Sequence, residues 1–143
     1  MKIEYRNGNL LDTDIKHILH GCNARGVMGS GVAKLIRQKW PKAYEDYSIV
    51  YNSVGLQLGS YITSTQPDGK IVINGITQET YGKTGVHISY WAIANIIRNL
   101  NSDGIKYIAM PQIGAGLGGG DWRVIEAIIE NESKRFQPVV YIL

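Results

Sequence analysis

The sequence predicts a three-layer α/β fold, with helices on both faces of a central mixed sheet. Short apolar runs bounded by glycine, proline or asparagine alternate with segments whose apolar residues recur at helical spacing. Glycines gather at 21–31, 75–85 and 114–120, each time after an apolar run, which is typical of loops at strand ends and not of linkers. Because ligands of such sheets lie beyond the carboxyl ends of the strands, these loops are the candidate site.

Four elements are expected in the first half of the chain. They are strands at 2–6 and 17–23 and helices at 31–40 and 42–54. Pro41 either ends the first helix or begins the second at its first position, where proline's missing N–H is no loss. Gly55 is the expected C-terminal cap of the second helix.

Six further elements are expected in the second half. They are strands at 59–65, 70–77, 105–111 and 139–143 and helices at 86–100 and 121–136. The turn 66–69 joins two of the strands, Asp121 is the natural N-cap of the last helix, and Pro138 precedes the last strand. Strands alternating with helices over 1–143 predict one domain.

Composition excludes several classes of protein. The chain has 143 residues, a size that suits one domain, and no segment reaches the ~18 continuous apolar residues of a membrane span. No signal peptide is evident at the N-terminus, and the single cysteine, Cys22, excludes an intrachain disulfide, so a cytoplasmic protein is expected. The net charge of +3 is mild and its Lys and Arg are scattered, which favours a small anionic ligand over a long nucleic acid.

Two passages combine a strand, a glycine-rich loop and a helix, at 18–36 and 107–122. A helix N-terminus offers unpaired N–H groups and a partial positive charge, and glycines let a phosphate approach the backbone closely. Either loop alone could be a tight turn without a ligand. Together the two loops could enclose a diphosphate from both sides.

Two known phosphate fingerprints do not fit. Lys34 is followed by Leu35, so the first loop is not a Walker A motif. Gly114, Gly116 and Gly119 do match the spacing of a dinucleotide-binding loop. However, the following strand at 139–143 carries no Asp or Glu for a ribose, so the sequence does not predict a nicotinamide enzyme.

The loop sequences resemble those of a known family. GNLLDTDIKHILHGCNARGVMGSGVAKLI (8–36), GKIVINGITQETYGKTG (69–85) and MPQIGAGLGGGDW (110–122) are similar to macro domains. The subgroup that they resemble contains yeast-type ADP-ribose 1″-phosphate phosphatases, related bacterial and phage proteins, and the vertebrate terminal ADP-ribose glycohydrolase. The resemblance covers essentially the whole chain.

This resemblance implies a macro fold that binds ADP-ribose in a cleft at the carboxyl edge of the sheet. It implies adenine contacts from Asn9, Leu10, Tyr141 and Leu143, and a distal-ribose contact from Asn23. It implies a first phosphate loop formed by Val27, Met28, Gly29, Ser30 and Gly31. It implies a second phosphate loop formed by Ile113, Gly114, Ala115, Gly116, Leu117 and Gly118. Asn9 replaces the family's aspartate, and Asp12 is the nearby carboxylate that could compensate.

The resemblance is less complete for catalysis. Gln78 and Gly118 stand where the glycohydrolase branch has a lysine and an aspartate. The first acid after the second loop is Asp121, whose expected role is the helix cap. The phosphatase branch carries a histidine matched by His20 in HGCN, three residues before Asn23. His20 either relays a proton or orients water, typically worth ~10²–10⁴-fold, or is a buried strand histidine.

Other reactive side chains are given structural roles. Cys22 is expected to be a small core residue, and His17 and His87 have no metal-ligand spacing. The loop 80–85 is expected to border the distal ribose, with Lys83 either meeting a terminal phosphate or solvated. Met28, Trp91 and Trp122 are expected to be packing residues, and Met28 could also lie at the pocket wall.

The leading hypothesis is therefore an ADP-ribose-binding hydrolase that acts on ADP-ribose 1″-phosphate, with His20 and Asn23 as the catalytic candidates. The alternatives are removal of ADP-ribose from modified protein or nucleic acid, and binding without catalysis. A cytoplasmic monomer without cofactor or metal is expected in each case.

Overall fold

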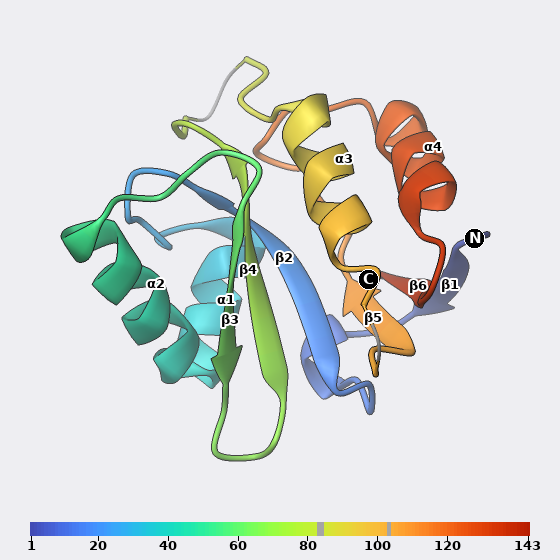
Figure 1. Ribbon diagram of the computed structural model, residues 1–143, viewed down its shortest axis with the longest axis horizontal. Coiled ribbons are helices and arrows are strands. Elements are labelled where there is room, and N and C mark those ends of the chain that lie inside the picture. Colours follow the sequence, from blue (N-terminus) through green and yellow to red (C-terminus); the bar gives the residue numbers. More distant parts are fainter. Residues whose placement is uncertain (83–84, 103) are drawn as a thin grey trace.

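The computed structural model describes residues 1–82, 85–102 and 104–143. Its elements form a central sheet with α1 and α2 on one face and α3 and α4 on the other (Figure 1). In chain order they are β1 (Glu4–Asn7), the 3₁₀ helix η1 (Leu10–Asp12), β2 (His17–Asn23), α1 (Gly31–Lys39), α2 (Pro41–Ser53), β3 (Tyr61–Thr65), β4 (Ile71–Gln78), α3 (Tyr90–Asn99), β5 (Tyr107–Met110), α4 (Trp122–Glu132) and β6 (Gln137–Ile142). The predicted three-layer fold class is confirmed.

The sheet brings the carboxyl ends of five strands to one edge. Its strand order is β1-β6-β5-β2-β4-β3, and every pair is parallel except β3 with β4. β1 pairs with β6, so strands from the two ends of the chain lie side by side. This arrangement places the segments that follow β1, β2, β4, β5 and β6 along the same edge.

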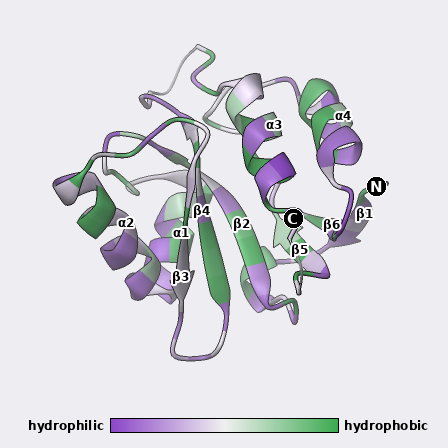
Figure 2. Ribbon diagram, in the orientation of Figure 1, coloured by the Kyte–Doolittle hydropathy of each residue, from purple (hydrophilic) through white to green (hydrophobic). Residues whose placement is uncertain are grey.

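Side-chain alternation along the strands builds a separate apolar cluster on each face. In β2, Ile18 packs with Ile36 and Trp40 on the α1–α2 side, whereas Leu19 packs with Ile96 on the α3–α4 side. All of these side chains are buried. β4 is largely hydrophobic along its length (Figure 2), as expected for a strand covered on both faces.

Helix boundaries follow local capping more closely than apolar spacing. Pro41 is the first residue of α2, so the second of the two expectations for it is confirmed. α3 begins at Tyr90 and not at Val86, because the Ser89 side chain accepts from the Ala92 N–H and caps the helix there. The segment before it stays extended and forms an isolated bridge between Gln78 and Ile88.

β6 includes Pro138, which was expected to precede the strand. The N–H of Gln137 donates to Lys106 O on the β5 side, so the nitrogen of Pro138 faces the β1 side. Pairing with β1 starts only one residue later, between Glu4 and Val139. No ladder hydrogen bond is lost at Pro138, and the strand can include it.

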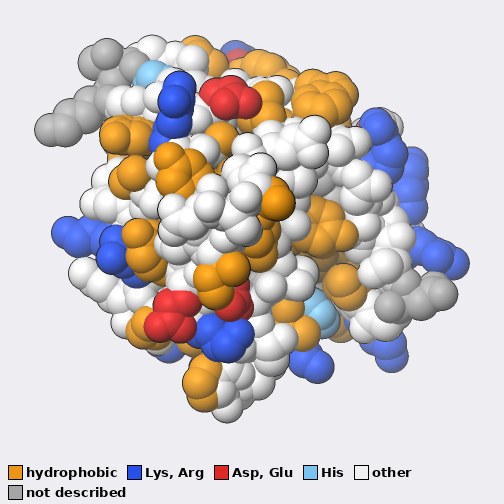
Figure 3. All heavy atoms as spheres, turned by 60° about the vertical axis from the view of Figure 1, so that its left-hand side comes forward, with side chains coloured by type: hydrophobic (Ala, Val, Ile, Leu, Met, Phe, Trp, Pro, Cys, Tyr) orange, Lys and Arg blue, Asp and Glu red, His pale blue; other side chains and the backbone are white. Residues whose placement is uncertain are grey.

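No helix formed by the described residues is long and apolar enough to cross a membrane. On the face seen in Figure 3, several Lys and Arg side chains lie along the right-hand edge, and the Asp and Glu side chains lie nearer the middle of the view.

Candidate functional site

The carboxyl edge of the sheet gathers the residues that the sequence singled out. Asn9 and Leu10 follow β1, and Asn23 ends β2. The predicted second phosphate loop follows β5, and Tyr141 and Leu143 lie at the end of β6. Residues from four separate parts of the chain thus reach one edge.

Asn23 organises the first loop through its side chain. Its Oδ1 accepts from the Arg25 N–H at 2.9 Å, and its Nδ2 donates to Val27 O at 2.8 Å. These bonds close the chain into a turn directly after β2. The Val27 N–H and the Tyr47 hydroxyl also lie 3.4 and 3.1 Å from Oδ1, so the second amide hydrogen of Nδ2 is what remains for a ligand.

Tyr47 of α2 fixes Asn23 through its hydroxyl group, a role that the sequence did not reveal. Its hydroxyl donates to Asn23 O at 2.6 Å and lies 3.1 Å from Asn23 Oδ1. The Tyr47 side chain is fully buried, and burial raises its pKa, so the hydroxyl keeps its proton. The prediction of a helix at 42–54 gave Tyr47 no role, since no local pattern links α2 to the end of β2.

Tyr47→Phe is expected to weaken ligand binding in the cleft and to lower stability. The substitution leaves Asn23 O and Oδ1 without this buried donor, which costs about 1–3 kcal/mol. Calorimetric titration and urea unfolding measure the two effects. Tyr44→Phe is the matched control, because the half-buried Tyr44 makes ring contacts and no hydroxyl hydrogen bond within the described residues; equal effects of the two substitutions would contradict the role of Tyr47.

The start of α1 presents backbone donors that nothing else uses. The N–H groups of Met28, Gly29, Ser30 and Gly31 donate to no other group in the described part of the chain. Ser30 occupies the N-cap position without a side-chain hydrogen bond, and the first turn holds no acidic residue. The positive end of the helix is therefore uncapped and open to an anion.

The second loop divides into an open part and a packed part. Nothing lies within 4 Å of the position of a Cβ on Gly116, whereas a Cβ on Gly118 would lie 2.3 Å from Ile88 Cγ2. A Cβ on Gly119 would lie 2.3 Å from Gly85 O. The packed glycines seat the loop on the segment before α3, where Gly118 O accepts from the His87 N–H at 2.8 Å.

The open part of this loop faces the first loop. The N–H groups of Gly114, Gly116, Leu117 and Gly118 donate to no group among the described residues. A Cβ on Gly31 would lie 3.6 Å from Leu117 Cδ1, so the two loops approach one another at this point. Two sets of unpaired backbone donors thus border one space, as a diphosphate requires.

The positions matched to a lysine and an aspartate in the glycohydrolase branch lie together. Gln78 Oε1 is 3.2 Å from the position of a Cβ on Gly118. Their proximity supports the position-by-position match, although neither residue here is ionisable. Asp121 caps α4 through the Arg123 N–H and pairs with the Arg123 guanidinium, which lowers its pKa. Its expected role as helix cap is confirmed.

His20 lies inside the protein, beneath α2. It is fully buried, with Nε2 2.6 Å from Asn74 Oδ1 and 3.6 Å from Cys22 Sγ. Burial lowers the pKa of the imidazole to about 4. Asn74 Nδ2 in turn donates to Ala43 O of α2. These contacts match the second alternative, a buried strand histidine, and its hydrogen-bond partner is the Asn74 side chain. The catalytic role of His20 stays a prediction.

For several other candidate residues, the side chain is not the part that is available to a ligand. The side chains of Met28 and Ile113 are buried in the core, which leaves their backbones for a ligand. The Asn9 side chain caps η1 through the Leu11 N–H, and Leu10 is buried beneath it. Tyr141 is half-buried against Thr13, and Leu143 is fully exposed. Lys83 lies outside the described residues.

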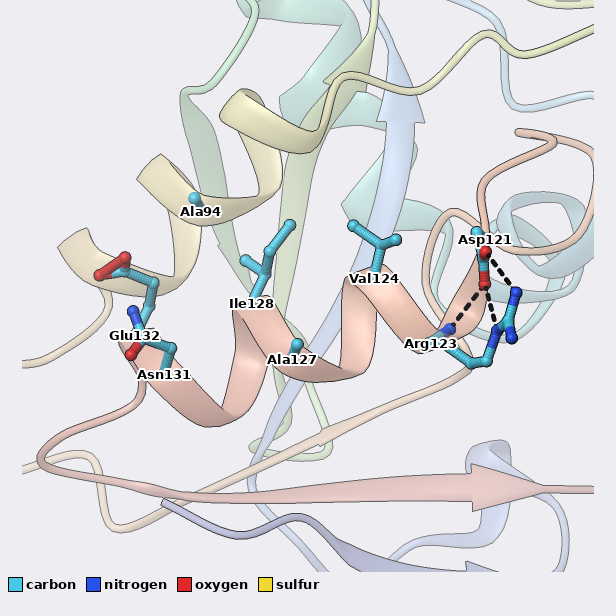
Figure 4. A pocket seen from close by; sticks show the side chains of 8 residues that line it. All are labelled: Ala94, Asp121, Arg123, Val124, Ala127, Ile128, Asn131 and Glu132. Carbon is cyan, nitrogen blue, oxygen red and sulfur yellow. Dashed lines mark hydrogen bonds and ion pairs between the residues drawn. The ribbon is translucent and has the colours of Figure 1, made fainter.

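A groove of about 600 Å³ runs along α4 on the helical face (Figure 4). Its walls are formed by Ala94 of α3 and by Val124, Ala127 and Ile128 of α4. The charged residues at its ends are already paired, Asp121 with Arg123 and Glu132 with Arg98. At the described residues this groove offers no unpaired charged cluster, and it follows α4 from Asp121, just after the second loop, to Glu132.

Fold and site together define an α/β protein whose sheet edge presents two backbone-amide loops to an anionic ligand. The family model for the macro domain matches residues 19–129, and the chain belongs to the macro domain family.

Relatives extend over nearly the whole chain. An uncharacterised 17.5 kDa protein from the tk–vs intergenic region of Enterobacteria phage T4 is 32% identical and covers 98% of this chain and 96% of its own. The ADP-ribose 1″-phosphate phosphatase of Candida albicans is 32% identical and covers 90% of this chain and 92% of its own. A solved structure of a protein of unknown function from Bacteroides thetaiotaomicron superposes with a TM-score of 0.88 at 29% identity, covering 100% and 99% of the two chains.

Proposed function

We propose that this protein binds ADP-ribose between its two glycine loops and hydrolyses ADP-ribose 1″-phosphate to ADP-ribose and phosphate. The observation that carries the proposal is the pair of facing, unpaired N–H sets after β2 and β5. They would hold the diphosphate, with Asn23 at the distal ribose and Leu10 and Tyr141 at the adenine. Similarity to the Candida albicans phosphatase over nearly the full chain supports the choice of substrate.

The chemistry requires little from ionisable side chains. Water attacks the phosphorus, the bond between phosphorus and the C1″ oxygen breaks, and that oxygen takes up a proton as phosphate leaves. The backbone donors hold the diphosphate and so position the distal ribose and its 1″-phosphate for attack by water. Asn23 fixes the ribose and so the direction of attack. The imidazole of His20 acts on this site only through Asn74 or Cys22, because none of its surface is exposed.

Incubation of the pure protein with ADP-ribose 1″-phosphate tests the proposal by the release of inorganic phosphate. Turnover above that of an Asn23→Ala variant is the expected result. Micromolar binding of ADP-ribose without phosphate release would favour a non-catalytic reader. Release of ADP-ribose from glutamate-, serine- or nucleic-acid-linked substrates would favour the de-ADP-ribosylating alternative. Absence of any binding heat with ADP-ribose would overturn the whole proposal.

A further inference from the structure

A second hollow lies between α3 and the segment that leads into β3. It encloses about 510 Å³, and uncharged residues alone line it: Gln57, Leu58, Gly59, Ser60, Tyr61, Trp91, Asn95 and Asn99. Trp91 is 62% exposed, so its expected packing role is wrong. An exposed indole beside several amide side chains is typical of a binding surface.

The indole of Trp91 is held in place by the loop. A Cβ on Gly59, whose φ is +85°, would lie 2.8 Å from Trp91 Cζ3 and 3.1 Å from Cη2, so the edge of the six-membered ring contacts the loop. Most of the side chain stays exposed. Trp91 Nε1 donates to no group within the described residues. One edge of the ring is therefore held by the loop, and the exposed indole is available for stacking.

The amides beside the ring offer acceptors. Asn95 Nδ2 donates to Gly59 O at 3.1 Å, and Asn99 Nδ2 donates to Asn95 O at 2.9 Å. These bonds fix both amides, while their Oδ1 atoms accept no hydrogen bond from the described residues. A ligand that matches this hollow has a planar ring that can stack on the indole and a hydrogen-bond donor on the edge of that ring.

We propose that this hollow binds a nucleobase that carries an exocyclic amine, as adenine and cytosine do. The base stacks on Trp91, and its amine donates to Asn95 Oδ1 or Asn99 Oδ1, in the way that amides read base edges. No charged residue lines the hollow, so it binds the base and not the phosphates.

The site is separate from the proposed ADP-ribose cleft but close to it in the fold. The Gly59 N–H donates to Ile76 O, two residues before β4 ends at Gln78. Nucleobase binding at this separate hollow can therefore be tested whether or not the protein hydrolyses ADP-ribose 1″-phosphate.

Titration of the ¹⁵N-labelled protein without ADP-ribose tests the inference, because the adenine of ADP-ribose would itself compete for the hollow. The probes are adenosine, cytidine, inosine, uridine and a short single-stranded oligonucleotide, and the readout is the Trp91 indole N–H resonance, assigned with Trp91→Phe. Adenosine and cytidine are expected to shift it more strongly than inosine and uridine. Trp91→Ala is expected to lower affinity between about five- and 100-fold, and Tyr107→Ala, an exposed aromatic at the start of β5, to leave it unchanged.

Affinity for the nucleosides is expected to be the same between about 50 and 200 mM salt. A stronger but still salt-insensitive response to the oligonucleotide identifies a base within a strand as the ligand, and an equal response identifies the free nucleoside. Strongly salt-dependent oligonucleotide binding would overturn the inference, since phosphates would then dominate. Equal responses to adenosine and inosine, no Trp91 shift with any probe, or shifts with neutral monosaccharides alone would also overturn it. Because the Trp91 resonance reports on the hollow itself, the result does not depend on whether ADP-ribose binds between the two loops.

Discussion

Gly116→Val is expected to reduce ADP-ribose affinity by about 100-fold or more while leaving the free energy of unfolding nearly unchanged. Nothing lies within 4 Å of the added Cβ, and Gly116 does not have a positive φ, so the free protein accommodates the side chain. In the proposed complex the same space is filled by the diphosphate. Losing two charge-assisted hydrogen bonds, each worth about 1.5–3 kcal/mol, accounts for a change of that size. Calorimetric titration with ADP-ribose and urea unfolding measure the two quantities.

Gly119→Ala is the matched control in the same loop. Its Cβ would lie 2.3 Å from Gly85 O, and its φ of +74° disfavours any residue with a side chain. This variant is expected to lose stability, and to lose binding only in proportion to unfolding. The contrast separates a ligand-facing glycine from a packing glycine. Unchanged ADP-ribose affinity in folded Gly116→Val would show that the second loop does not border the ligand.

The sequence predicted the architecture well because the signals for it are local. Apolar runs of strand length, glycine clusters behind them and helical spacing each depend on neighbouring residues only. The range of β2, His17–Asn23, agrees with the predicted 17–23. Errors arose where a cap or a neighbouring strand decides the boundary, as Ser89 does for α3 and β1 does for Pro138.

The site was predictable in its position but not in its internal contacts. The residues flanking the cleft follow the strands, so topology alone brings them to one edge. The contacts of His20 depend on the register between β2 and β4, which places it opposite Asn74. The support of Asn23 by Tyr47 depends on how α2 packs against the sheet. Neither register nor packing angle leaves a signal at one position of the chain.

The buried His20 is expected to make the protein about 3 kcal/mol less stable at pH 4 than above pH 6.5. Burial lowers the pKa of the folded-state imidazole to about 4 from an ordinary value of 6.5. Below pH 6.5 the unfolded chain therefore binds a proton that the folded protein rejects. Stability is fully present above pH 6.5 and falls as the pH drops toward 4, by about 1.4 kcal/mol for each unit of pKa difference. Urea unfolding across this range measures the loss.

His20→Gln removes the titrating group, and its free energy of unfolding is expected to vary less with pH over the same interval. His17→Gln is the matched control on the same strand, because His17 is only half-buried. This substitution is expected to reduce the pH dependence of the free energy of unfolding by less than His20→Gln does. Nuclear magnetic resonance reads the His20 titration directly. A measured pKa near 6.5 would contradict the burial argument and would revive direct proton transfer by His20. A value near 4 would mean that the imidazole stays neutral at neutral pH, so that His20 influences the reaction by holding Asn74 against α2 and not by exchanging a proton with the substrate.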